Sequence, residues 1–205
     1  WDQMGARIKN VFVYVVGQSR LPKNGYLYSG ISHIFIFGAF MVLSVDTINF
    51  VTDGGLKAFG VATNTALADL PFGGNFHLPF TEPGDAYQAV ADTFRFLCIV
   101  GLVMAFVNRT IIKPKRLPLT RDAMYTLFFI LGLMVFEVTQ QGFLLAHSHS
   151  DGELSHIWFS SLFAMTVGGL DPETLRAGHQ VSWWIHLALL LSFTNYVPWS
   201  KHSHV

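Results

Sequence analysis

Three histidines have the side-chain chemistry and the spacing to hold a metal inside a helix bundle. His186 and His204 bracket the last apolar stretch and are eighteen residues apart. On one continuous helix this is almost five turns, so both imidazoles would project from one face, roughly 27 Å apart along the axis. His33 lies just inside an earlier apolar stretch. Imidazoles that face each other across a bundle are typical axial ligands of haem iron, and haem binding is therefore the first hypothesis.

The composition indicates a membrane protein. Apolar residues make up 51% of the chain, charged residues 13%, and the formal net charge is zero. This balance is unusual for soluble domains, and a neutral chain lacks the basic face that nucleic acid requires. Cys98 is the single cysteine, so an iron–sulfur cluster would need thiolates from another chain or domain. Because the sequence begins at Trp1 without a signal region, we expect a piece of a longer or processed protein.

Five apolar stretches predict an all-α transmembrane helix bundle. Four of them approach or exceed the roughly 20 residues that a membrane-crossing helix needs, and one is shorter. The four long stretches are residues 26–51, 90–112, 123–146 and 181–199, and the short one is residues 154–170.

Charges in the loops predict how many of these stretches cross. Cytoplasmic loops carry the excess of lysine and arginine, and here basic residues gather before the first span, between the second and third, and after the last. A full crossing by residues 154–170 would put Lys201 outside and Arg176 inside. We therefore expect four crossings plus one short re-entrant or surface helix. Residues 1–25 are expected to form a cytoplasmic amphipathic lead-in segment.

This topology predicts the depth of each histidine. The first span ascends from the cytoplasm and the last descends, so His33 and His204 would share the inner level, whereas His186 would lie near the outer surface, two turns into the last helix. His202 would point about 160° away from His204, which makes His204 the better partner. A histidine at a helix end can also be a plain polar residue at headgroup level, although ionisable groups within a membrane are usually functional.

Two segments resemble a known family. Residues 183–205, WWIHLALLLSFTNYVPWSKHSHV, resemble the last helix of the respiratory nitrate reductase gamma-subunit family of cytochromes b, with a proline twelve residues and a second histidine eighteen residues after the first. Residues 17–47, GQSRLPKNGYLYSGISHIFIFGAFMVLSVDT, are similar to its second helix. This segment and residues 113–117 look most like the branch coupled to heterodisulfide-reductase-like iron–sulfur proteins, which includes electron-transfer-flavoprotein:menaquinone oxidoreductase-like anchors. Residues 53–85 match nothing in that family.

The resemblance implies a ligand set for haem b. His33 and His204 would be the axial pair of an inner haem, and His186 would bind a second, outer haem. The nitrate reductase branch has another histidine ten residues after the first, where this chain has Leu43. Either the outer haem is absent and the inner pair alone binds, or His147 at the end of the third span replaces the missing ligand. In the alternative without a ligand role for His147, residues 147–156 form a solvated loop. The remaining outer histidines, expected in loops, are His77, His149, His156 and His179.

Three charged residues lie within the predicted spans. Asp46 and Arg95 should both lie in the outer half of the membrane, where they could simply pair with each other. In the functional alternative, Arg95 binds a haem propionate or a quinone carbonyl, and Asp46 or Glu137 relays protons to the quinone. Glu137 lies midway along the third span and needs a partner or water.

A haem held between two imidazoles has no open position for oxygen, so it moves electrons. The resemblance implies that an iron–sulfur protein or domain on the cytoplasmic side exchanges electrons with the inner haem, and that a quinone, with menaquinone favoured, reacts in a pocket of the bundle. We therefore expect residues 1–205 to be the electron-transfer cytochrome b domain of a quinone oxidoreductase in a bacterial or archaeal cytoplasmic membrane.

Two other classes of protein fit the composition. The first is a haem-free anchor or packing subunit, in which the histidines are polar interface residues. The second is a membrane di-iron oxygenase, which is disfavoured because most of its candidate ligands fall in an outer loop.

Overall fold

The computed structural model describes residues 3–16, 26–58, 86–114, 120–148 and 157–199, and the regular structure within these ranges is helical. Short π-helical segments, Val11–Val16 and Asn108–Ile112, extend the first and third helices, and a 3-10 turn, Val197–Trp199, follows the last. The α-helices are α1 (Met4–Asn10), α2 (Leu27–Ala58), α3 (Ala86–Val107), α4 (Arg121–Ser148), α5 (Trp158–Val167) and α6 (Pro172–Tyr196).

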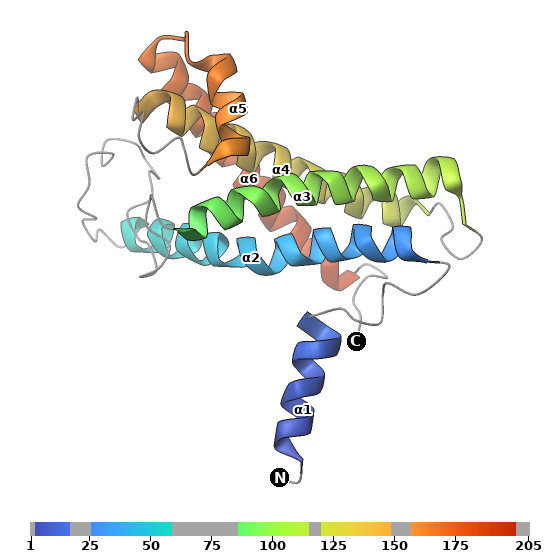
Figure 1. Cartoon of the computed structure of the whole chain (residues 1–205). Coiled ribbons are helices and arrows are strands. Elements are labelled where there is room, and N and C mark those ends of the chain that lie inside the picture. The colour runs from blue at the N-terminus through green and yellow to red at the C-terminus, as the bar shows by residue number, and fades with distance from the viewer. Residues whose placement is uncertain (1–2, 17–25, 59–85, 115–119, 149–156, 200–205) are drawn as a thin grey trace.

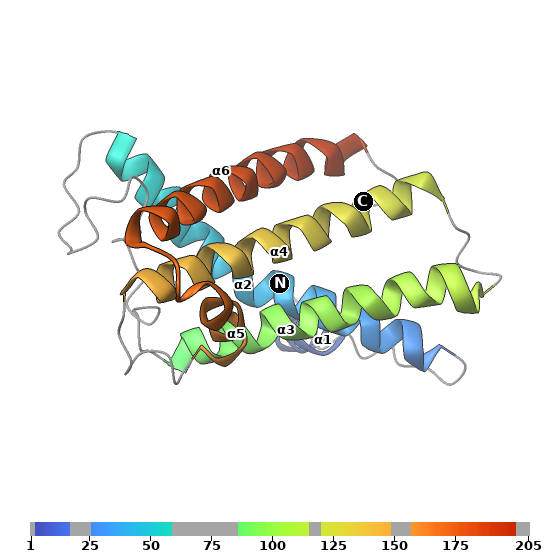
Figure 2. The ribbon, with the colours of Figure 1, turned by 90° about the horizontal axis from the view of Figure 1, so that it is seen from above.

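Four long helices form the bundle. Packing is most extensive between α2 and α3 and between α4 and α6, and α3 joins the two pairs through α4 (Figure 1). Seen from above, the N-terminal ends of α2 and α4 lie at the same end of the bundle as the C-terminal ends of α3 and α6 (Figure 2). The first predicted span therefore begins at the same end of the bundle at which the last one ends, as predicted.

Three helical segments are long and apolar enough to cross a membrane: Leu27–Asn49, Ala86–Ile112 and Arg121–His147. They coincide with the first three predicted spans to within a few residues. The short apolar stretch forms α5, whose ten residues are too few to cross a hydrocarbon core. The lead-in segment is helical over Met4–Val16, and α1 buries none of its residues.

The ends of the helices follow from local chemistry. Lys113 adopts a left-handed conformation with φ of 48°, and Pro114 comes next, so the third helix stops there. The last helix begins at Pro172, after the N-cap residue Asp171, nine residues earlier than the apolar pattern predicts. At its other end the α-helix stops at Tyr196. The spacing of His186 and His204 predicts one uninterrupted α-helix. This prediction is wrong over Val197–Trp199, where Pro198 lies in a 3-10 turn.

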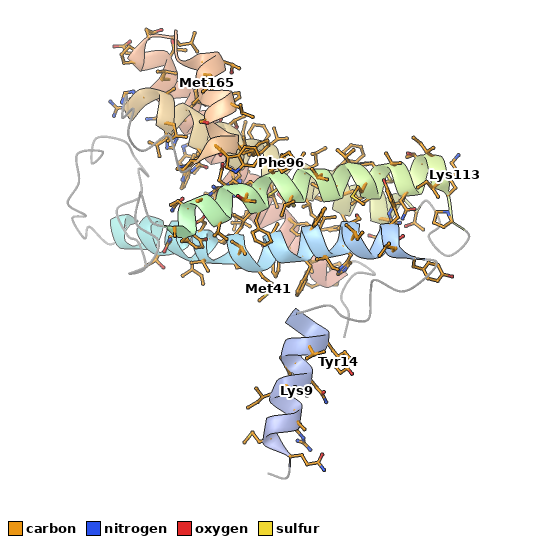
Figure 3. The ribbon with its side chains drawn as sticks, in the orientation of Figure 1. Lys9, Tyr14, Met41, Phe96, Lys113 and Met165 are labelled. Atoms are coloured by element: carbon orange, nitrogen blue, oxygen red, sulfur yellow. The ribbon has the colours of Figure 1, made fainter. Side chains whose placement is uncertain are left out.

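A carboxylate of α3 holds the short helix α5 in place. Asp92 is fully buried and accepts hydrogen bonds from the backbone N–H groups of Phe159 (2.5 Å) and Ser160 (3.1 Å) and from the Ser160 hydroxyl (2.6 Å). These bonds satisfy N–H groups at the N-terminus of α5 that have no partner within the helix. On the next turn of α3, the Phe96 ring meets the rings of Trp158 and Phe159 (Figure 3). Protein thus covers the N-terminal turn of this non-crossing helix.

Small residues bring α2 and α3 into close contact. The Ser32 hydroxyl donates a hydrogen bond of 2.8 Å to the backbone oxygen of Gly101. A Cβ atom at Gly101 would lie 2.9 Å from the backbone carbonyl oxygen of Ser32 and 3.0 Å from the Phe35 Cβ. Close approach at a small residue is a common way for membrane helices to pack.

Replacing Gly101 by alanine should therefore destabilise the bundle. The new methyl group meets backbone, which must move, and overpacking of this kind costs about 1–3 kcal/mol. We expect Gly101→Ala to lower the thermal unfolding midpoint in detergent by several degrees. The matched control is Gly169→Ala, since a Cβ there meets nothing within 4 Å. Equal midpoints for the two variants would contradict the close contact.

The cap of α6 should make stability depend on pH. The pKa of Asp171 is lowered because its carboxylate accepts hydrogen bonds from the Thr174 hydroxyl (2.6 Å) and backbone N–H (3.0 Å). A lowered pKa in the folded state contributes stability above the unfolded value of about 3.9, and this contribution is lost as the pH falls through the folded pKa. Asp171→Ala should lower the unfolding midpoint at neutral pH, and the difference from the unmodified protein should shrink as the pH falls below the unfolded value of about 3.9. A difference that stays constant would disprove the role of the charge.

Candidate functional site

A buried guanidinium lies at the centre of the bundle. Arg95 of α3 is 2% exposed, and its Nη2 atom donates to Asp46 Oδ2 of α2 at 2.8 Å and to Glu137 Oε1 of α4 at 3.1 Å. Its Nη1 atom lies 3.8 Å from the Asp92 carboxylate on the same helix. The predicted pairing of Asp46 with Arg95 is confirmed, and Glu137, whose partner was left open, shares the same guanidinium.

His186 extends this charge network to α6. Its Nε2 atom lies 3.5 Å from Glu137 Oε2, and its Nδ1 atom lies 3.2 Å from the backbone oxygen of Leu133 on α4. His186 lies fourteen residues after Pro172, hence about four turns into the helix rather than two. We use the term four-helix network for Asp46, Arg95, Glu137 and His186, because each comes from a different helix of the bundle.

His179 was expected in a loop, and this prediction is wrong. It lies within α6, is 2% exposed, and its Nδ1 atom is 3.1 Å from the backbone oxygen of Gln140. A carbonyl oxygen only accepts hydrogen bonds, so Nδ1 of His179 and of His186 must carry the proton in each contact. The two histidines are seven residues apart, as are the carbonyls of Gln140 and Leu133 that they meet. This seven-residue repeat was the sequence signal for His179, since residues two turns apart share a helix face.

The other candidate ligands are separated from this network. His33 is exposed on α2, where its ring stacks on Phe37 with centroids 6.2 Å apart. It precedes Asp46 by thirteen residues, roughly 20 Å along the helix. His147 lies at the C-terminal end of α4, close enough to His179 for their charges to interact. Five histidines lie outside the described residues. They are His77, His149, His156, His202 and His204.

The described ranges contain no group of three or more His, Cys, Asp or Glu residues that could hold a metal ion. Cys98 is buried in the apolar core between α2 and α3. The predicted role of Arg95 toward a propionate or a quinone stays a prediction. Its buried Nε and Nη1 atoms, which carry one and two N–H groups, have no hydrogen-bond acceptor among the described residues.

Comparison with known proteins finds two curated relatives. The chain is 31% identical over 200 residues to the probable iron-sulfur-binding oxidoreductase FadF of Bacillus subtilis, an alignment that covers 97% of this chain and 25% of the relative. It is 24% identical over 221 residues to the EtfAB:quinone oxidoreductase of Syntrophomonas wolfei, covering 100% of this chain and 27% of that protein. The chain thus spans about a quarter of the length of these relatives.

No family model matches the chain. No solved structure matches it either. The two relatives are oxidoreductases whose names specify iron–sulfur binding and reaction with a quinone, as expected for the electron-transfer-flavoprotein:quinone oxidoreductase branch. Membership of the wider nitrate reductase gamma-subunit family stays a prediction.

Removing the Arg95 guanidinium should destabilise the bundle more than any other single charge deletion in it. Arg95→Leu leaves the partly buried Asp46 and Glu137 without their shared cation, and breaking a buried ion pair from one side costs up to about 3–5 kcal/mol. We expect a large fall in the thermal unfolding midpoint in detergent. Neutralising both carboxylates as well, with Asp46→Asn and Glu137→Gln, should recover part of the loss. If the triple variant is no more stable than Arg95→Leu, the network is not held by charge pairing.

Proposed function

We propose that this chain is the membrane-embedded b-type cytochrome domain of a quinone oxidoreductase, passing electrons between an iron–sulfur partner and the quinone pool. The observation that carries the proposal is the likeness to two oxidoreductases over nearly the whole chain, combined with a bundle of long apolar helices. Because each relative is about four times as long as this chain, the iron–sulfur partner would be another domain of the same protein or a separate subunit.

The proposal treats α6 as the fourth crossing. Its 25 residues rise by roughly 37 Å, which exceeds the thickness of a hydrocarbon core, and it packs along α4. The end of the bundle where α2 begins carries Arg109, Lys113 (labelled in Figure 3) and Arg121 with one carboxylate, Asp122. Asp171 and Glu173 lie at the opposite end with Arg176. The excess of positive charge at the first end supports a cytoplasmic location for it. The iron–sulfur partner would dock there.

His33 and His204 would hold the haem at this cytoplasmic end. The imidazole of His33 lies on the exposed surface of α2, two turns from its start, and the chain leaves α6 at the same end of the bundle. Between two imidazoles, haem b would supply reversible one-electron transfer without a free position for oxygen. The protein's own part is to fix the ring of His33 against Phe37, keep the site within apolar helices and set the distance to the partner.

A second candidate is a haem-free anchor subunit. It is favoured by one observation: both histidines of α6 that the structure describes make hydrogen bonds to the α4 backbone, as purely structural residues would. An absorption spectrum of the purified protein separates the candidates. A reduced-minus-oxidised spectrum with the bands of low-spin haem b supports the cytochrome, and a spectrum without them supports the anchor.

The ligand assignment makes a sharper prediction. His33→Ala and His204→Ala should each abolish the haem bound at the cytoplasmic end, because each removes one of its two axial ligands. His202→Ala is the matched control, since helical spacing predicts that this neighbouring histidine points away from His204, and its haem content should equal that of the unmodified protein. Haem content per protein is measured as the pyridine haemochrome. Loss of haem in His202→Ala together with its retention in His204→Ala would reverse the assignment.

A further inference from the structure

We infer that His179 of α6 and His147 of α4 together bind a metal through their imidazole nitrogens, at the end of the bundle where α6 begins. The inference is carried by three features of the described residues. They are the state of the two nitrogens of His179, the position of His147 on the face of α4 that meets α6, and the apolar packing around the pair.

The first feature is the His179 ring. An imidazole that binds a metal donates a proton from one nitrogen and offers the lone pair of the other. Nδ1 of His179 meets the first condition, because it lies 3.1 Å from the Gln140 backbone oxygen and must carry the proton there. Nε2 therefore carries the lone pair, and it is buried without a hydrogen-bond partner among the described residues. A buried acceptor without a donor is costly, so this lone pair is suited to an added partner.

The second feature is the position of His147. The two residues of α4 whose carbonyls meet histidines of α6 are Leu133 and Gln140, seven residues apart, and His147 follows after another seven. Residues at this spacing share a helix face, so His147 lies on the face of α4 that packs against α6.

The two rings also approach each other along the bundle. Side chains of a helix lean toward its N-terminus. Because α4 and α6 are antiparallel, the His147 ring should lean back toward the level of Gln140, and the His179 ring toward the end where α4 stops (Figure 2). The rings are close enough for their charges to interact. Imidazoles from two neighbouring helices thus converge on one region.

The third feature is the apolar packing around the pair. Gly178 precedes His179 and lies so near α4 that a Cβ there would be 2.6 Å from the Phe143 ring. Phe143 in turn meets the Phe163 ring of α5 edge to face. Beside His147 lies a small apolar cluster, which consists of Leu145, Ala146, Ile157 and Ala164. An apolar shell of this kind controls the access of solvent to a bound metal.

Two sources would supply a metal that imidazole nitrogen prefers, namely the iron of a haem and a free divalent ion such as Zn²⁺. Two imidazoles complete the axial ligation of haem iron, whereas a free ion needs further donors. The Gln140 side chain brings one to the same interface, since its buried Oε1 atom has no hydrogen-bond partner among the described residues. A haem at this site rests on the proposed function and adds His179 to its ligands, and a free ion is independent of that function.

The test measures haem and zinc in the full-length protein purified from the membrane, for the unmodified chain and for His179→Gln and His147→Gln. Haem is measured as the pyridine haemochrome, and zinc by mass spectrometry after dialysis against Zn²⁺ and then against metal-free buffer. We expect both variants to lose one haem per chain or one zinc ion per chain. Loss of haem identifies iron as the metal, and loss of zinc alone identifies a free divalent ion. If either variant keeps both quantities, the pair does not bind a metal and the inference is wrong.

The matched control is Ser182→Ala, which disturbs the same interface without removing an imidazole. The Ser182 hydroxyl lies one turn from His179 on α6, 3.4 Å from the Thr139 hydroxyl of α4. This variant should keep the haem and zinc of the unmodified protein, and a loss equal to that of His179→Gln would overturn the inference in favour of packing.

Two further outcomes keep the test decisive. His179→Gln retains a side-chain N–H that can donate toward Gln140, and if it still fails to accumulate, His147→Gln at the partly exposed end of α4 decides alone. A protein without any haem, whose two histidine variants nevertheless lose one zinc ion, would refute the proposed cytochrome and support the metal site.

Discussion

The need to neutralise one buried guanidinium constrains the whole bundle. An unpaired charge at the depth of Arg95 would cost several kcal/mol, so the helices must pack with carboxylates around it. Asp46 and Glu137 supply them from α2 and α4. Asp92, near the same guanidinium, caps α5, and Glu137 also meets His186 on α6. One side chain of α3 thereby sets how the other helices are rotated and how far they slide along one another.

The pairing of α4 with α6 fixes the position of the C-terminal end of the last helix. Hydrogen bonds from His179 and His186 to carbonyls seven residues apart would both break if α6 slid by one residue. At the other end of the interface, the Tyr196 hydroxyl donates to the Asp122 carboxylate at the start of α4. The chain therefore leaves α6 at a defined level, on which the proposed pairing of His204 with His33 would depend.

The predictable parts of the structure are those set by the membrane and by pairs of opposite charge. Apolar runs of sufficient length predicted three helices to within a few residues, and equal depth predicted the contact of Asp46 with Arg95. The start of α6 was missed because the Asp171–Pro172 cap, rather than apolar content, begins the helix, and His179 was therefore assigned to a loop. The partner of Glu137 depends on α3 lying beside α4, which no local pattern encodes. The turn at Pro198, by contrast, had a local signal, since proline breaks an α-helix, and the spacing of His186 and His204 alone did not take it into account.

The four-helix network and His33 lie at different levels along the bundle. The network joins the helices at one level, and His33 lies exposed on α2 near the end where this helix begins. An experimental structure of the full-length protein, resolved well enough to place side chains, tests this arrangement most directly. We expect a porphyrin between His33 and His204, with Arg95 and Glu137 in mutual contact at the other level. A His33 side chain without a porphyrin beside it would contradict the account.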